Sequence, residues 1–86
     1  MNEPYALANL PAPTLQLPVH FRNAGTEYVL KPDGDRWSVH RLNHRTSTEI
    51  ITLEQLQDGS WLGVSSESDS TKYFGATRQD VLRQVL

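Results

Sequence analysis

The sequence predicts an α+β fold in which an antiparallel β-meander of about five strands is packed by one C-terminal helix and preceded by an extended, Pro-rich N-terminal arm. Three observations lead to this prediction. Short apolar runs alternate with turn residues from residue 26 onward, residues 77–86 combine a helix cap with one apolar stripe, and four of the five prolines lie in residues 1–24. A chain of 86 residues is expected to form one domain. We therefore expect an arm over residues 1–24 and a single small α+β domain over residues 25–86.

The arm is expected to be extended. Residues 10–18 read Leu-Pro-Ala-Pro-Thr-Leu-Gln-Leu-Pro. Proline lacks a backbone N–H and fixes φ, so this stretch suits neither a helix nor a central strand. Two arrangements stay open: the leucines strap the arm across the sheet, or the arm is a loose tail.

Two hairpins follow. The expected strands are residues 26–31, 36–42, 48–57, 60–65 and 72–74. Pro32 and Gly34 suit a turn between the first two strands. Asp58-Gly59 is a strong signal for a two-residue hairpin turn between the third and fourth. Residues 43–47 and 66–71 are polar and are expected to be connections.

The chain is expected to end in a helix. The Thr77 hydroxyl and the Asp80 amide are spaced as in a capping box. Four apolar residues then form one stripe: Val81, Leu82, Val85 and Leu86. Arg78 and Arg83 are expected to face water. A helix this short is unstable alone, so we expect it to pack on the sheet.

The second hairpin predicts the two faces of the sheet. A two-residue turn at Asp58-Gly59 pairs Leu56 with Trp61, and side chains alternate with a period of two. The core face is then expected to carry Ile51, Leu53, Leu62 and Val64, and the opposite face Ile50, Leu56 and Trp61. The second set is either covered by the arm or forms a patch for a partner, which Trp37 extends.

The residue inventory argues against catalysis. The chain has no cysteine, which excludes thiolate zinc sites, disulfides and thiol nucleophiles. His40 and His44 are four residues apart, but on a strand and a turn this spacing loses its metal-binding geometry. The sequence contains no phosphate-binding glycine motif and no Gly-x-Ser-x-Gly elbow. We expect no enzyme activity, no cofactor and no metal.

The absence of a long apolar stretch predicts a soluble protein without a membrane span, and the lack of cysteine and of a signal-peptide pattern predicts a cytoplasmic location. The net charge of −2 disfavours a general nucleic-acid binder. Residues 36–45 nevertheless combine basic and aromatic side chains, so a nucleic-acid-binding surface there is an alternative to a solvated strand and turn.

The C-terminal part resembles a known family. Asp58-Gly-Ser-Trp61 through Gly75-Ala-Thr-Arg-Gln-Asp-Val-Leu82 is similar to the end of HicB-type antitoxin domains, which have a Gly-Trp strand, a second strand and a Gly-Asp-Thr helix start. The chain departs from that pattern at Ala76 and over residues 66–70. The resemblance implies a partial HicB-like fold and an antitoxin-like regulator.

By elimination, the sequence predicts a small non-enzymatic protein-binding module, acting as an adaptor, inhibitor or regulatory subunit. The expected contact surface is an aromatic patch on one sheet face with two steering arginines: Trp61, Leu56, Trp37, Arg36 and Arg41. The partner is expected to be another protein, with a homodimer left open. The alternatives are the antitoxin-like regulator and a nucleic-acid-binding module that uses residues 36–45.

Overall fold

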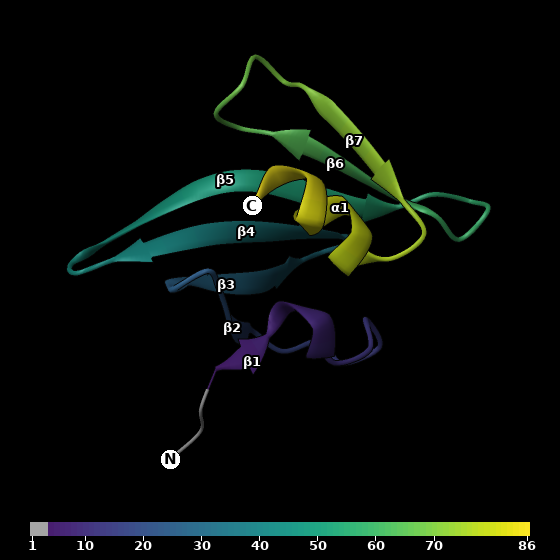
Figure 1. The fold of residues 1–86 in the computed structure, drawn as a ribbon. Coiled ribbons are helices and arrows are strands. Elements are labelled where there is room, and N and C mark those ends of the chain that lie inside the picture. Colours follow the sequence, from purple (N-terminus) through teal and green to yellow (C-terminus); the bar gives the residue numbers. More distant parts are fainter. Residues whose placement is uncertain (1–3) are drawn as a thin grey trace.

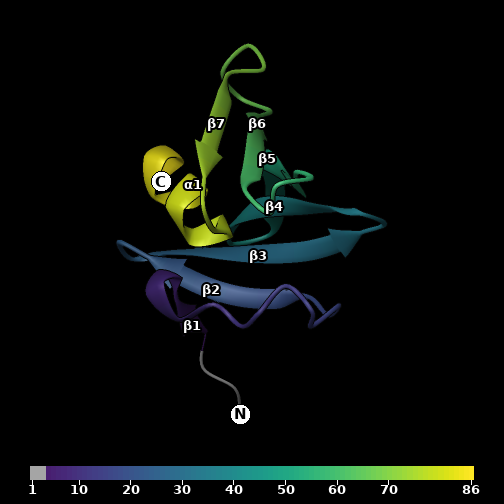
Figure 2. The same cartoon turned by 90° about the vertical axis from the view of Figure 1, so that its right-hand side faces the viewer.

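The computed structural model describes residues 4–86. Seven strands form one sheet in the order β1 to β7, and the sheet curls into a half-barrel (Figures 1 and 2). The strands are β1 (Tyr5–Ala6), β2 (Val19–Asn23), β3 (Thr26–Asp33), β4 (Arg36–Asn43), β5 (Thr46–Gln55), β6 (Trp61–Ser65) and β7 (Lys72–Gly75). A 3₁₀ helix, η1 (Leu7–Asn9), follows β1, and the short helix α1 (Arg78–Val85) ends the chain.

The predicted five-stranded meander packed by a helix is therefore wrong: the chain is mostly sheet. The two additional strands lie in the segment that the prolines had indicated as an arm. β2 pairs antiparallel with β3, and the turn between them is made by Ala24 and Gly25 at φ 51° and 81°. Positive φ at both central residues is what a tight hairpin needs, but alanine rarely supplies it. The sequence signal for this hairpin was accordingly weak.

The β5–β6 hairpin has a different register from the predicted one. Gln55 pairs with Trp61, and Leu53 pairs with Gly63. The Leu56 N–H donates to the Ser60 carbonyl at 2.8 Å and Gly59, at φ 90°, donates to the Leu56 carbonyl at 3.0 Å. The loop thus has three residues and closes with glycine in a bulge position, instead of a two-residue turn.

A shift of one residue exchanges the two faces of a strand. On β6, Trp61 and Gly63 consequently face the core, whereas Leu62 and Val64 are half-buried on the other side. The predicted core face, which contained Leu62 and Val64, is wrong for this reason.

A bulge between β4 and β5 changes the face of the sheet on which Ile50 lies. The pairing shifts between Val39 and His40, which leaves Ile50 without a partner in the ladder. Both Ile50 and Ile51 are buried as a result, although strict alternation had placed Ile50 on the opposite face from Ile51.

The core fills the concave side of the half-barrel. It consists of Leu7, Leu10, Val19, Phe21, Tyr28, Leu30, Trp37, Val39, Ile50, Ile51, Leu53, Trp61, Val81 and Leu82. Leu7 and Leu10 come from the chain that precedes β2, and Val81 and Leu82 come from α1, so both ends of the described chain close over the same side of the sheet (Figure 1).

Helix α1 begins where the capping pattern predicted. The Thr77 hydroxyl accepts a hydrogen bond from the Asp80 amide at 3.2 Å, and Val81 and Leu82 are fully buried. Arg83 is exposed as expected. The expectation that Arg78 faces water is wrong, because only 2% of this residue is exposed.

Gly63 allows α1 to approach β6. A Cβ atom at this position would lie 2.5 Å from Val81 Cγ1 and 2.7 Å from Ile51 Cδ1. We predict that Gly63→Ala lowers the free energy of unfolding by about 1–3 kcal/mol through overpacking. Urea denaturation followed by tryptophan fluorescence measures this loss, and an unchanged midpoint would show that α1 moves freely away from the sheet.

The register also predicts the effect of removing Trp61. Because Trp61 is 5% exposed, Trp61→Ala is expected to destabilise the fold by about 3–5 kcal/mol. Leu62→Ala, at the neighbouring half-buried position, is the matched control. It is expected to lower the free energy of unfolding by much less. Thermal unfolding by circular dichroism compares the two variants; equal losses would contradict the observed register.

Candidate functional site

The predicted aromatic patch is not present on the surface. Trp61 and Trp37 are 5% and 3% exposed and belong to the core, and Leu56 is half-buried at the β5–β6 turn. The patch depended on the two-residue turn, so the corrected register removes it.

The two steering arginines lie on β4, Arg36 as its first residue and Arg41 in its second half, and each faces a carboxylate. Arg36 Nε is 3.9 Å from Glu54 Oε2, and Arg41 Nη2 is 2.9 Å from Glu67 Oε2. The hydrogen bond with Glu67, helped by its negative charge, raises the pKa of Arg41. These pairs reduce the positive field that residues 36–45 present to a nucleic acid.

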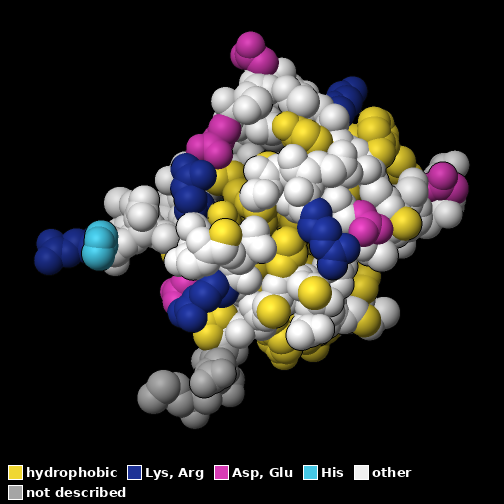
Figure 3. All heavy atoms as spheres, viewed as in Figure 1, with side chains coloured by type: hydrophobic (Ala, Val, Ile, Leu, Met, Phe, Trp, Pro, Cys, Tyr) yellow, Lys and Arg dark blue, Asp and Glu magenta, His cyan; other side chains and the backbone are white. Residues whose placement is uncertain are grey.

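The β4–β5 hairpin projects from the body of the molecule (Figure 1) and carries Lys, Arg and His colours at its end (Figure 3). Its turn contains His44 and Arg45, both exposed. His40, farther back, lies 3.1 Å from the Ser38 hydroxyl through Nε2. Within residues 4–86, no group of three metal-ligating side chains comes together.

Exposed apolar side chains point to a different site. In the described part of the chain, four large hydrophobic residues are exposed: Tyr5 at 46%, Leu15 at 40%, Leu17 at 58% and Phe74 at 59%. The first three line one groove, while Phe74 lies at the opposite edge of the sheet on β7. Yellow side chains gather over the N-terminal segment at the lower side of Figure 3.

We call this groove the arm groove. Its volume is about 610 Å³, and its lining residues are Pro4, Tyr5, Leu15, Leu17, Pro18, Val19, His20 and Glu27. Most of these belong to the N-terminal segment and only Glu27 comes from β3.

The path of the chain explains the groove. β1 pairs in parallel with β2, and residues 7–18 make the connection between them. Within that connection the Leu15 N–H donates to the Ala12 carbonyl at 3.0 Å, and the Gln16 side chain donates to the Pro13 carbonyl at 3.0 Å. This turn brings the chain back toward β2, so β1 and the returning segment form the two walls.

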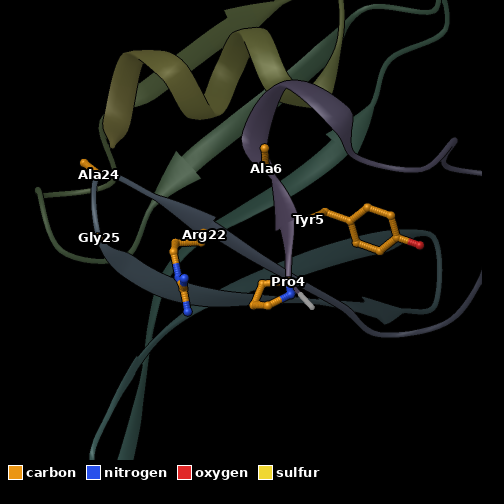
Figure 4. A pocket seen from close by; sticks show the side chains of 6 residues that line it. All are labelled: Pro4, Tyr5, Ala6, Arg22, Ala24 and Gly25. Carbon is orange, nitrogen blue, oxygen red and sulfur yellow. The ribbon is translucent and has the colours of Figure 1, made fainter. Parts of the chain in front are cut away.

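A second hollow of about 550 Å³ lies on the other side of β1 (Figure 4). Arg22 and Pro4 line it, and the Tyr5 ring extends away from both. Arg22 Nη2 is 2.6 Å from Glu27 Oε1, which itself lines the arm groove. This ion pair therefore links the two hollows and neutralises the carboxylate at the groove.

Sequence reasoning missed this site. It identified the leucines of the arm as apolar, but it expected them to be covered or loose instead of lining a groove. Leu10 is buried whereas Leu15 and Leu17 are exposed, and this division depends on the turn at residues 12–15. Pro13 is at the second position of that turn, which proline favours, but the segment was expected to be extended. Tyr5 gave no signal because its exposure depends on the position of β1.

Among residues 4–86, no helix is long and apolar enough to cross a membrane. No family model, curated protein or solved structure matches the chain, so the resemblance of its C-terminal part to HicB-type antitoxins stays a prediction.

Proposed function

We propose that the protein is a small binding module whose arm groove takes an extended, apolar and uncharged segment of another protein. The observation that carries this proposal is the gathering of three of the four exposed large hydrophobic residues in one groove. Exposed apolar surface is costly in a small soluble domain, and where it is contiguous it commonly marks an interaction site.

The shape of the groove favours a segment over a flat protein face. A volume of about 610 Å³ lies within the range of sites that enclose small ligands, roughly 300–1,000 Å³. Such a hollow accommodates a few side chains of an extended chain. Tyr5 is suited to this contact because a rigid aromatic ring with a polar end covers a large area at low entropic cost.

The charges around the groove favour an uncharged partner segment. Besides the Tyr5 phenol, the described charged or titratable residues that line it are Glu27 and His20, and Glu27 is already paired with Arg22. Affinity would then come from apolar burial and depend little on salt. Nucleic-acid binding through residues 36–45 would instead weaken steeply as salt rises.

The composition of the chain supports a non-enzymatic role and a reducing compartment. A non-enzymatic role as adaptor, inhibitor or regulatory subunit is supported by the residue inventory, and a reducing compartment such as the cytoplasm by the lack of cysteine.

Selection from a displayed library of random decapeptides tests the proposal. We predict that peptides selected on the wild-type protein are apolar and uncharged, and that Leu17→Asp lowers their affinity at least about tenfold, because a charge is placed where apolar surface is buried. Leu17 is 58% exposed, so the variant is expected to keep its fold. Fluorescence anisotropy with a labelled selected peptide measures the affinity.

Phe74→Asp is the matched control, since Phe74 is equally exposed and lies outside the groove. Its affinity should equal that of the wild type. If Phe74→Asp abolishes binding while Leu17→Asp does not, the contact surface lies at β7. Selected peptides that bind both variants as well as the wild type would refute a role for the arm groove.

A further inference from the structure

Arg78 is the most unusual residue in the structure. It is the first residue of α1, yet only 2% of it is exposed. Its guanidinium carbon lies 4.6 Å from the centroid of the Trp37 ring and 5.8 Å from that of Trp61. No carboxylate of the described chain forms an ion pair with it, and burial lowers its pKa.

A buried cation requires compensation. The faces of the two indole rings supply part of it, because they carry negative potential. One hydrogen bond supplies another part: Arg78 Nη2 donates to the Pro11 carbonyl at 2.6 Å, across 67 positions of sequence. Nη1 is buried without a partner in the described structure, so the Pro11 carbonyl is an essential acceptor for this guanidinium.

Pro11 occupies a critical position for the arm groove. One wall of the groove, Pro4 and Tyr5, precedes it in the chain, and the other wall, Leu15 to Pro18, follows it. Leu7 and Leu10 anchor the preceding part through burial in the core. After Pro11 most side chains are exposed until Val19, so Arg78 makes the last long-range hydrogen bond before the chain reaches β2.

We infer that Arg78, seated on Trp37 and Trp61, is a positioning residue that holds Pro11 and thereby sets the distance between the two walls of the arm groove. The consequence for binding rests on the proposed function, whereas the effect on the arm does not. The arm would be held to α1 at Pro11, and α1 would thereby control whether the groove is formed. A lysine would replace the positive charge but not the flat, multiply donating guanidinium.

Amide hydrogen exchange followed by mass spectrometry tests this inference on the full chain. In Arg78→Met, which keeps an unbranched apolar side chain, exchange in residues 4–18 is expected to accelerate at least about tenfold while β3, β4 and β5 keep their protection. Arg83→Met is the matched control on the same helix, since Arg83 is exposed and contacts Asp80 at 3.3 Å. Unchanged protection of residues 4–18 in Arg78→Met would overturn the inference.

Arg78→Lys resolves the case in which Arg78→Met fails to fold. The lysine retains a cation and a donor, so the sheet should stay protected and the arm should exchange at a rate between those of the wild type and Arg78→Met. Arm protection equal to the wild type in a folded Arg78→Lys protein, together with global unfolding of Arg78→Met, would mean that Arg78 acts on the whole fold and not on the arm.

A binding readout separates this inference from the proposed function. Nile red, an uncharged dye that fluoresces in apolar hollows, is titrated into the same variants. Reduced dye binding in Arg78→Met along with faster arm exchange supports both. Faster arm exchange with no dye binding to any variant, the wild type included, supports the role of Arg78 in holding the arm and counts against the groove as an apolar binding site. Dye binding that Leu17→Asp removes and Arg78→Met leaves intact, with the arm still protected, refutes the role of Arg78 and leaves the groove as a binding site.

Discussion

The three-residue turn that ends at Gly59 determines which side of β6 faces the core, and the remaining contacts depend on that choice. With Gln55 opposite Trp61, the indole turns inward and Gly63 lies beneath α1. Because Gly63 has no side chain, Val81 reaches the sheet and α1 lies close to β6 and β7. The first turn of α1 is then near both tryptophans, which brings the Arg78 guanidinium over their rings.

This arrangement makes the two ends of the described chain depend on each other. Burying a guanidinium without a carboxylate is unfavourable, and the contact with the Pro11 carbonyl offsets part of the cost. The hydrogen bond is part-buried, and it also gives the Pro11 carbonyl a donor. The leucines of the N-terminal segment add apolar burial on the same side of the sheet. The arm, the helix and the two tryptophans thus form one cooperative unit, and a substitution in any of them alters the contacts of the others.

The sequence predicted the elements whose signals are local. Gly34, at φ 66°, identified the β3–β4 turn, and Thr77 identified the start of α1. Pro32 was expected in the same turn, but it lies in β3 opposite Trp37. It failed where tertiary packing decides between locally acceptable alternatives. Asp58-Gly59 suits a two-residue and a three-residue loop alike, and the choice between them moves Trp61 from one face to the other. Arg78 was placed in water because charged residues are rarely buried, and only the nearby rings make an exception possible.

The arm groove arises from a conflict that proline imposes on the N-terminal segment. Its leucines favour burial, but prolines at positions 11, 13 and 18 cannot donate to a strand ladder, so residues 11–18 cannot join the sheet edge as a continuous strand. The chain turns at residues 12–15 instead, which leaves Leu15 and Leu17 exposed beside Tyr5. Pro4 and Pro18 also lie at this edge and limit strand addition by a partner. A partner segment would therefore bind the groove through its side chains, and its specificity would follow from their size and apolar character.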